Sequence, residues 1–214
     1  MLLERIMRLA GTSIPEQLEK PQGWIGRFIT TRWLDRGNAA LYQFCLQLME
    51  ARPEQEILEV GFGSGRSLGM LATTGARVCG VDFSPDMIRK ATRINRAQVR
   101  AGRIRVELAG VSALPYPDST FDSVLTTNTI YFWPDPARDS LELLRVLKPG
   151  ARLFLGYRPK EILEKIPVLD NRFRLYTHDD VRSLFDRHGA TTQIRERAEP
   201  TGFDSYCAIV QKAG

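Results

Sequence analysis

Cysteine and histidine are scarce in this sequence. Among 214 residues there are three cysteines and two histidines. Cys45, Cys79 and Cys207 stand far apart and form no CxxC pair, so their pattern indicates neither a disulfide framework nor a zinc site. We expect three small, buried thiols and no bound metal.

Long apolar runs are missing as well. No run reaches the roughly 18 residues that identify a membrane-spanning helix. Glu4, Arg5 and Arg8 interrupt the beginning of the chain, which therefore lacks the apolar stretch of a secretory signal. These absences predict a cytoplasmic protein without a membrane span.

The composition excludes the non-globular classes. Hydrophobic residues make up 43% and charged residues 26% of the chain, as in ordinary globular domains rather than disordered, collagen-like or coiled-coil proteins. Lys and Arg number 30 and Asp and Glu 25, and the net charge of +5 favours anionic partners only modestly. The length fits one full-sized domain of about 150 residues with an extension.

From residue 55 onward, short apolar runs alternate with amphipathic stretches, as in a parallel sheet covered by helices. The pattern predicts an α/β fold with a doubly wound, mostly parallel sheet. Helices are expected over about 66–74, 85–101, 136–146 and 178–188, and Ser84, Asp135 and Thr177 are placed to cap the last three. Seven strands are predicted, over residues 56–60, 77–82, 104–108, 121–127, 151–157, 190–196 and 205–211.

Residues 1–54 show no strand pattern. They contain one helical stretch, at about 35–51. We therefore expect an N-terminal helical cap, or lid, over residues 1–54, packed against an α/β domain over residues 55–214.

A glycine-rich turn follows the first predicted strand, in the segment from Glu59 to Gly65. Glycines at a strand–helix junction let the backbone approach a ligand closely. Asp82 stands 21 residues after Gly61, at the end of the next strand, where a carboxylate can accept both hydroxyls of a ribose. The spacing therefore indicates a ligand that contains a nucleoside.

The spacing of the glycines in the turn further restricts the class of ligand. It is G-x-G-x-G, and Arg66 stands where the dinucleotide fingerprint has its third glycine, which argues against a pyrophosphate cofactor. Glu59 would repel phosphates but suits the ammonium group of an amino acid. A ligand that joins a nucleoside to an amino acid is S-adenosylmethionine.

Four segments, in order, carry a family resemblance: 57–66, 81–87, 114–122 and 143–150. Over residues 55–157 the chain resembles the class I S-adenosylmethionine-dependent methyltransferases, which have a Rossmann-like fold. It is most similar to their small-molecule branch, which includes the ubiquinone/menaquinone-biosynthesis enzymes. The resemblance implies S-adenosylmethionine as cofactor, S-adenosylhomocysteine as product and no metal.

The resemblance also implies cofactor-binding residues. The glycine turn would line the methionine and ribose portion, Glu59 would orient the amino end, and Asp82 would hold the ribose. Phe83 and Met87 would flank the adenine, although ordinary packing is the alternative for both. The expected cofactor-binding set is Glu59, Gly61, Phe62, Gly63, Gly65, Asp82, Phe83, Met87, Gly110, Val111, Ser112 and Asn128.

One position departs from the family. Members often have an acidic residue where this chain has Gly110, so the side-chain hydrogen bond to the adenine amino group is absent. Backbone groups of Gly110 and Val111, or the Ser112 hydroxyl, can replace part of it. We expect binding to survive with a loss of about 1 kcal/mol.

Aromatic residues after the fourth strand suggest an acceptor pocket, because ligands of open α/β sheets bind at this edge. Packing under the N-terminal cap is the alternative. Methyl transfer depends mainly on in-line positioning, so a catalytic base is optional, and Tyr131 and His178 are the candidates. The residues expected to contact the acceptor are Trp24, Tyr131, Trp133, Tyr157 and Arg158.

Other acceptors are weighed against a small molecule. Asn128 is not followed by the Pro-Pro pair of adenine or glutamine methylation, and no cysteine near the fourth or fifth strand could attack cytosine, which argues against DNA. A small-molecule acceptor methylated at oxygen, nitrogen or carbon is thus favoured. Two alternatives stay open: an RNA methyltransferase or anionic-surface binder that uses the basic helix 89–105, and a non-catalytic binding protein. The oligomeric state is not predicted.

Overall fold

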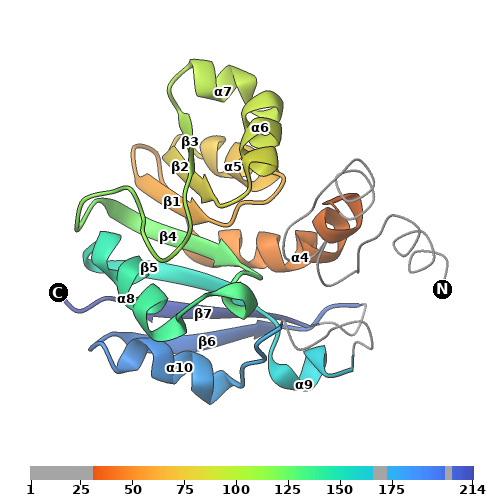
Figure 1. Cartoon of the computed structure of the whole chain (residues 1–214), viewed down its shortest axis with the longest axis vertical. Helices are drawn as coiled ribbons and strands as arrows, with labels where there is room; N and C mark the ends of the chain where they lie inside the picture. Colours follow the sequence, from red (N-terminus) through yellow and green to blue (C-terminus); the bar gives the residue numbers. More distant parts are fainter. Residues whose placement is uncertain (1–30, 166–172, 201–203) are drawn as a thin grey trace.

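The computed structural model describes residues 31–165, 173–200 and 204–214, with side chains from residue 38 onward. Its strands form one sheet in the order β3-β2-β1-β4-β5-β7-β6, in which β7 runs opposite to the other six described strands (Figure 1). The predicted fold class is therefore confirmed. The strands are β1 (Glu56–Val60), β2 (Arg77–Asp82), β3 (Ile104–Leu108), β4 (Phe121–Thr127), β5 (Leu147–Tyr157), β6 (Thr191–Arg197) and β7 (Ser205–Gln211).

Helices cover both faces of the sheet (Figure 1). One face carries α4, α5 and α6, and the other carries α8 and α10, as the two hydrophobic clusters show. The described helices are α4 (Thr31–Met49), α5 (Arg66–Ala72), α6 (Pro85–Ile94), α7 (Arg96–Arg100), the 3-10 helix η2 (Ile130–Phe132), α8 (Pro136–Val146), α9 (Lys160–Leu163) and α10 (His178–Asp186).

The central strands are buried on both sides, which explains their nearly continuous apolar runs. Ile57 packs under α4 and α5, whereas its neighbour Leu58 packs in the cluster of α8 and α10. Leu125 and Val124 divide in the same way on β4. Each such side chain, fully removed from water, contributes about 1.5–3 kcal/mol to folding.

Helix α4 is the described part of the expected N-terminal cap. It packs on β4, β5 and β7 and buries Leu41, Phe44, Cys45 and Met49 against the sheet. From residue 38 to 49 it thus forms a layer of the α/β domain. The division at residue 54 stays a prediction, since residues 1–30 lie outside the described ranges.

The single helix expected over 85–101 is wrong. Asn95 interrupts it, with φ −103° and ψ 22°, and separates α6 from α7. The Asn95 amide donates to Gly65 O at 2.7 Å and to Ala91 O at 3.1 Å. A distant contact with the glycine turn therefore accompanies the break, and the neighbouring Ile94 is exposed.

Two of the three expected helix caps are present. Asp135 accepts the Arg138 N–H at 3.2 Å at the start of α8, and Thr177 forms a capping box with Asp180 in α10. The expected side-chain cap by Ser84 is wrong, because within the described ranges its side chain accepts no such bond. The fifth strand starts at Leu147 rather than Ala151.

Candidate active site

The strand order reverses between β1 and β4, and the carboxyl ends of both strands meet at this point. In open α/β sheets ligands bind at such an edge. Here the turn after β1 continues into α5, and β2 delivers Asp82 beside it. The candidate site is built from the carboxyl ends of β1 and β2.

All three glycines of the turn are left-handed, with φ between 55° and 77°. A Cβ on Gly61 would lie 2.4 Å from Thr129 Cγ2, and one on Gly65 would lie 2.4 Å from Ala91 Cβ. A Cβ on Gly63 would meet no described atom within 4 Å. The protein itself therefore requires Gly61 and Gly65, whereas Gly63 leaves space for a ligand.

Asp82 is fixed by the backbone at the end of β2. Its Oδ2 accepts the Gly63 N–H at 3.0 Å, and its Oδ1 accepts the Ser84 N–H at 2.9 Å. Burial raises the pKa of Asp82 from 3.8 to about 6, and the two N–H donors counteract part of this rise. Each oxygen keeps a lone pair with which it can accept a hydroxyl.

Glu59 is buried at the end of β1, with 1% of its surface exposed. Burial raises its pKa from 4.5 to about 7; the hydroxyls of Tyr42 and Ser67 lower it in part, and Asp82 raises it. The Tyr42 and Glu59 side chains are close enough to interact, but the Tyr42 hydroxyl and Glu59 Oε2 are buried and neither makes a hydrogen bond of normal geometry with a described residue. Such atoms are costly unless a further donor satisfies them.

A known domain family matches this part of the chain. Residues 58–155, which run from β1 into β5 and include the glycine turn and Asp82, match the model described as a methyltransferase domain. Residues 58–155 therefore form a methyltransferase domain.

Relatives support this assignment. A 2-methyl-6-phytyl-1,4-hydroquinone methyltransferase from Synechocystis is 36% identical over 156 residues, which are 70% of this chain and 46% of that protein. A ubiquinone/menaquinone biosynthesis C-methyltransferase from Geobacter sulfurreducens is 36% identical over 99 residues, covering 45% and 39%. This chain thus matches half or less of the length of these curated relatives.

A solved structure shares the architecture. The S-adenosylmethionine-dependent methyltransferase from Methanosarcina mazei is 26% identical, with a TM-score of 0.61 over 76% of this chain and 94% of the other. The predicted family resemblance is confirmed.

The expected adenine side of the methyltransferase domain lies beside Asp82. Ala109 N–H donates to Asp82 O at 3.2 Å, so the loop with Gly110, Val111 and Ser112 starts beside Asp82. Phe83 is 46% exposed there. Met87 is 2% exposed and belongs to the core under α4 and α5, which favours the packing alternative for it.

Phe62 also packs inward. Its side chain lies in the same core, where a Cβ on Gly80 would come within 2.7 Å of its ring. Only its main chain belongs to the turn surface, and its carbonyl accepts the Gly65 N–H at 3.0 Å. Asn128 has φ 54°, and its N–H donates to Gly156 O at 2.8 Å, at the ends of β4 and β5.

Tyr131, a candidate base, is buried and hydrogen-bonded. Its hydroxyl accepts the Arg158 N–H at 2.6 Å and lies 3.3 Å from Asn128 Oδ1. Burial raises its pKa to about 12, although the Arg158 N–H lowers it in part. A phenol in this state is a weak proton acceptor near neutral pH.

The other residues expected to act as base or to contact the acceptor lie in separate hydrogen-bonded pairs. The His178 Nδ1 lies 2.6 Å from the Tyr157 hydroxyl, and the ring packs against Tyr206. Trp133 is buried, and its indole donates to Thr129 Oγ1 at 3.1 Å. The structure thus brings Tyr131 and Arg158 together, and separately Tyr157 and His178, whereas Trp24 lies outside the described residues.

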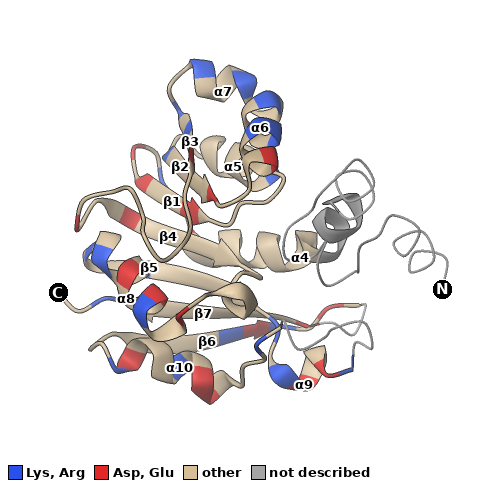
Figure 2. Ribbon diagram, viewed as in Figure 1, with Lys and Arg blue, Asp and Glu red and all other residues tan. Residues whose placement is uncertain are grey.

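Basic side chains gather along α6 and α7 (Figure 2). Arg89 pairs with Asp86, and Arg105 pairs with Glu107 and lies over the Tyr116 ring. The break at Asn95 divides this surface between two helices. The single basic helix of the RNA alternative is therefore not observed, although basic side chains lie along both α6 and α7 (Figure 2).

In the described ranges no group of three His, Cys, Asp or Glu side chains is placed to hold a metal ion. Among the helices that the structure describes, none is both long and apolar enough to cross a membrane.

Two contacts of the site were not found from sequence. Asn95 holds the carbonyl of Gly65 from 30 positions away, and Tyr42 reaches Glu59 from α4. Neither pairing has a local sequence signal, because the fold alone brings these elements together.

Proposed function

We propose that this chain transfers a methyl group from S-adenosylmethionine to a small-molecule acceptor and releases S-adenosylhomocysteine. The observation that carries the proposal is the pair of buried carboxylates on either side of Gly63. Glu59 has an unpartnered oxygen, Asp82 retains acceptor capacity, and the space above Gly63 is open. An amino acid joined to a nucleoside satisfies both ends of this arrangement.

The charges of the site fit this cofactor. Glu59 would hold the ammonium group of the methionine portion, helped by the Tyr42 hydroxyl, and Asp82 would accept the ribose hydroxyls. The loop over residues 110–112 would face the adenine, because it begins at the Asp82 carbonyl. Bound S-adenosylmethionine supplies an electrophilic methyl carbon, and its carbon–sulfur electron pair stays on sulfur when that bond breaks.

The residues of the chain contribute mainly by positioning. An acceptor held in line about 3 Å from the methyl carbon needs no covalent step from the protein. The half-buried Phe132 and Phe173 rings, whose centroids are 4.8 Å apart, offer an apolar wall beyond Tyr131. The proton that an oxygen, nitrogen or carbon acceptor loses on methylation passes to water in this proposal.

The relatives suggest which acceptors to test first. Two of them are described as acting on a hydroquinone or in ubiquinone/menaquinone biosynthesis, so aromatic ring acceptors are the first class to screen. Methylation at oxygen, nitrogen or carbon remains open. We also propose the division into a cap over residues 1–54 and a methyltransferase domain over residues 55–214.

Calorimetric titration tests the cofactor assignment. We expect micromolar binding of S-adenosylmethionine and S-adenosylhomocysteine and no binding of a nicotinamide dinucleotide, which lacks the amino acid end. Binding of the dinucleotide, or of neither sulfur ligand, contradicts the proposal. Transfer of a labelled methyl group to hydroquinones, with heat-treated protein as control, then tests the acceptor class.

A further inference from the structure

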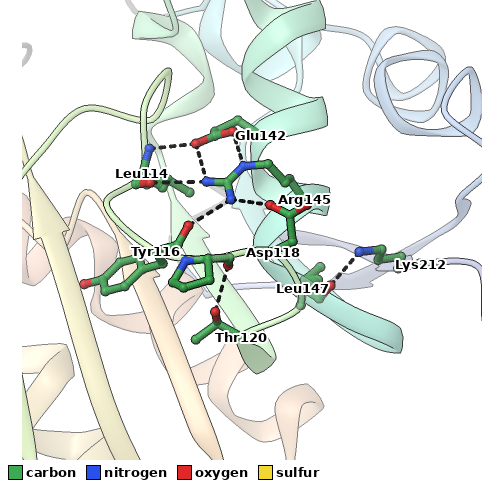
Figure 3. Close-up of polar contacts among 9 residues, drawn as sticks. Leu114, Tyr116, Asp118, Thr120, Glu142, Arg145, Leu147 and Lys212 are labelled. Atoms are coloured by element: carbon green, nitrogen blue, oxygen red, sulfur yellow. Dashed lines mark hydrogen bonds and ion pairs between the residues drawn. The ribbon is translucent and has the colours of Figure 1, made fainter.

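The loop between β3 and β4 is attached to α8 by one arginine (Figure 3). Arg145 Nη1 donates to Tyr116 O at 2.8 Å, and its Nη2 donates to Leu114 O at 3.2 Å. Glu142 Oε1 accepts the Leu114 N–H at 2.7 Å. Three main-chain groups of the loop are therefore held by two side chains on neighbouring turns of α8, which we call the Glu142–Arg145 clamp.

The two side chains of the clamp also fix each other. Arg145 Nε and Nη2 donate to the two carboxylate oxygens of Glu142 at 2.7 and 2.8 Å, which makes a bidentate pair. The pair is largely shielded, since the side chains are 30% and 16% exposed. Asp118 accepts a further bond from Nη1 at 2.7 Å, but its side chain is 77% exposed, so this bond contributes little.

The other end of the loop is fixed at the cofactor edge. In the register of β2 and β3, Asp82 is paired with Leu108, and the next N–H, of Ala109, donates to Asp82 O at 3.2 Å. Between this anchor and the clamp, Gly110 O accepts the Ala113 N–H at 3.3 Å in a turn. Residues 110–112 thus span from the ribose carboxylate to the clamp.

Recognition of the adenine base by this protein would depend on the main-chain groups of residues 110–112. Gly110 has no side chain, and a Cβ placed there would meet no described atom within 4 Å, so the loop is open at this point. Main-chain donors and acceptors distinguish one base from another only when the loop is held in one conformation, because ordering it on binding would consume affinity. A clamp that orders the loop beforehand removes that loss.

We infer that Arg145 and Glu142 are positioning residues for adenine recognition: they hold residues 110–112 in the conformation that reads the base. Neither contacts the cofactor, and both act through the loop. The inference rests on the proposed function, since it assumes that an adenine lies against these residues.

The test compares two ligands that differ only at the base. The full chain is titrated with S-adenosylhomocysteine and with S-inosylhomocysteine, in which an oxygen replaces the 6-amino group of the purine. In Arg145→Ala, affinity for the adenine ligand falls about 10-fold, the scale of one lost hydrogen bond, and affinity for the inosine ligand falls less. The preference for adenine therefore shrinks. Arg145→Lys behaves alike, because an ammonium group cannot bridge Glu142 and the loop as a fork does.

Matched controls separate positioning from general damage. Asp118→Ala removes only the exposed partner of Arg145, and Arg77→Ala removes an exposed arginine that pairs with Glu54 and Glu56 at the opposite ends of the strands. Both should keep the wild-type affinity and preference. Thermal unfolding checks every variant, and Glu142→Gln, which retains an acceptor for the Leu114 N–H, replaces Arg145→Ala if that variant does not fold.

The outcomes are distinct. Equal losses for both ligands, or no loss in the clamp variants, overturn the positioning role while wild-type binding stands. Failure of the wild type to bind S-adenosylhomocysteine overturns the proposed function, and this inference with it.

Discussion

Asp82 Oδ2 accepts the Gly63 N–H at 3.0 Å, which joins the end of β2 to the middle of the glycine turn. The same carboxylate accepts the Ser84 N–H through its other oxygen. The Asp82 carboxylate therefore holds both the turn and the start of α6. The same two bonds fix the direction in which its remaining lone pairs point. A substitution that preserves its shape but not its charge should disturb binding more than folding.

Asp82→Asn tests this relationship. The amide has one acceptor oxygen and cannot accept from both N–H groups and from a ribose, so affinity for S-adenosylhomocysteine should fall by about 1–3 kcal/mol. Asp122→Asn is the control, because Asp122 pairs with Lys148 at the other end of β4. Unchanged calorimetric affinity in Asp82→Asn would remove Asp82 from the site.

The cofactor affinity should rise with pH. Glu59 and Asp82 have pKa values of about 7 and 6, and both must be ionised to hold the ammonium group and the hydroxyls. Affinity should therefore increase about 20-fold between pH 6 and pH 8, with protons released at pH 7. Calorimetry in buffers of different ionisation enthalpy measures that release. A constant affinity over this range contradicts the assignment of Glu59.

The stability of the free protein should change in the opposite direction. The pKa of Glu59 is about 7 in the folded state against 4.5, so the folded state binds this proton more tightly than the unfolded state. The resulting stabilisation is complete below about pH 4.5 and is lost as pH rises through 7. In urea unfolding at pH 8, Glu59→Gln should be more stable than wild type by about 1–3 kcal/mol and should bind the cofactor poorly. A less stable variant at pH 8 would contradict this.

The sequence allowed a good prediction of the sheet and of the local part of the site. Strands such as 56–60 and 121–127 have the predicted bounds, because β-branched runs buried on both faces leave little ambiguity. The turn and Asp82 were found from their spacing alone. Both signals depend on residues within one β–α–β segment.

The contacts that could not be predicted from the sequence join segments that are far apart in the chain. Asn95 breaks the predicted helix while it bonds to Gly65, and Tyr42 and Arg145 meet their partners only after the helices pack. Met87 has an apolar side chain that suits either an adenine or a core, and only its burial against α4 and α5 distinguishes the two. Side-chain type does not encode such long-range encounters.

Tyr131→Phe tests the candidate base. The hydroxyl accepts the Arg158 N–H at 2.6 Å, so its removal leaves a buried donor unpaired and should lower the free energy of unfolding by about 1–3 kcal/mol. Because the pKa of Tyr131 is about 12, the pH profile of methyl transfer between 6 and 9 should keep its shape. If the variant loses a limb along which the wild-type rate rises with pH, that loss would instead identify Tyr131 as the base.

Alanine at two glycines of the turn should separate ligand space from packing space. Both positions have positive φ, so each substitution carries a backbone penalty of about 1–2 kcal/mol. Gly65→Ala adds a collision, since its Cβ would lie 2.4 Å from Ala91 Cβ, and it should unfold at clearly lower urea concentration. Gly63→Ala meets no described atom, so its stability should fall only by that backbone penalty, but cofactor affinity should fall at least tenfold, because the methyl group occupies the space left for the ligand. Unfolding curves and calorimetry on the same two proteins decide the matter: full affinity in Gly63→Ala would move the ligand away from the turn.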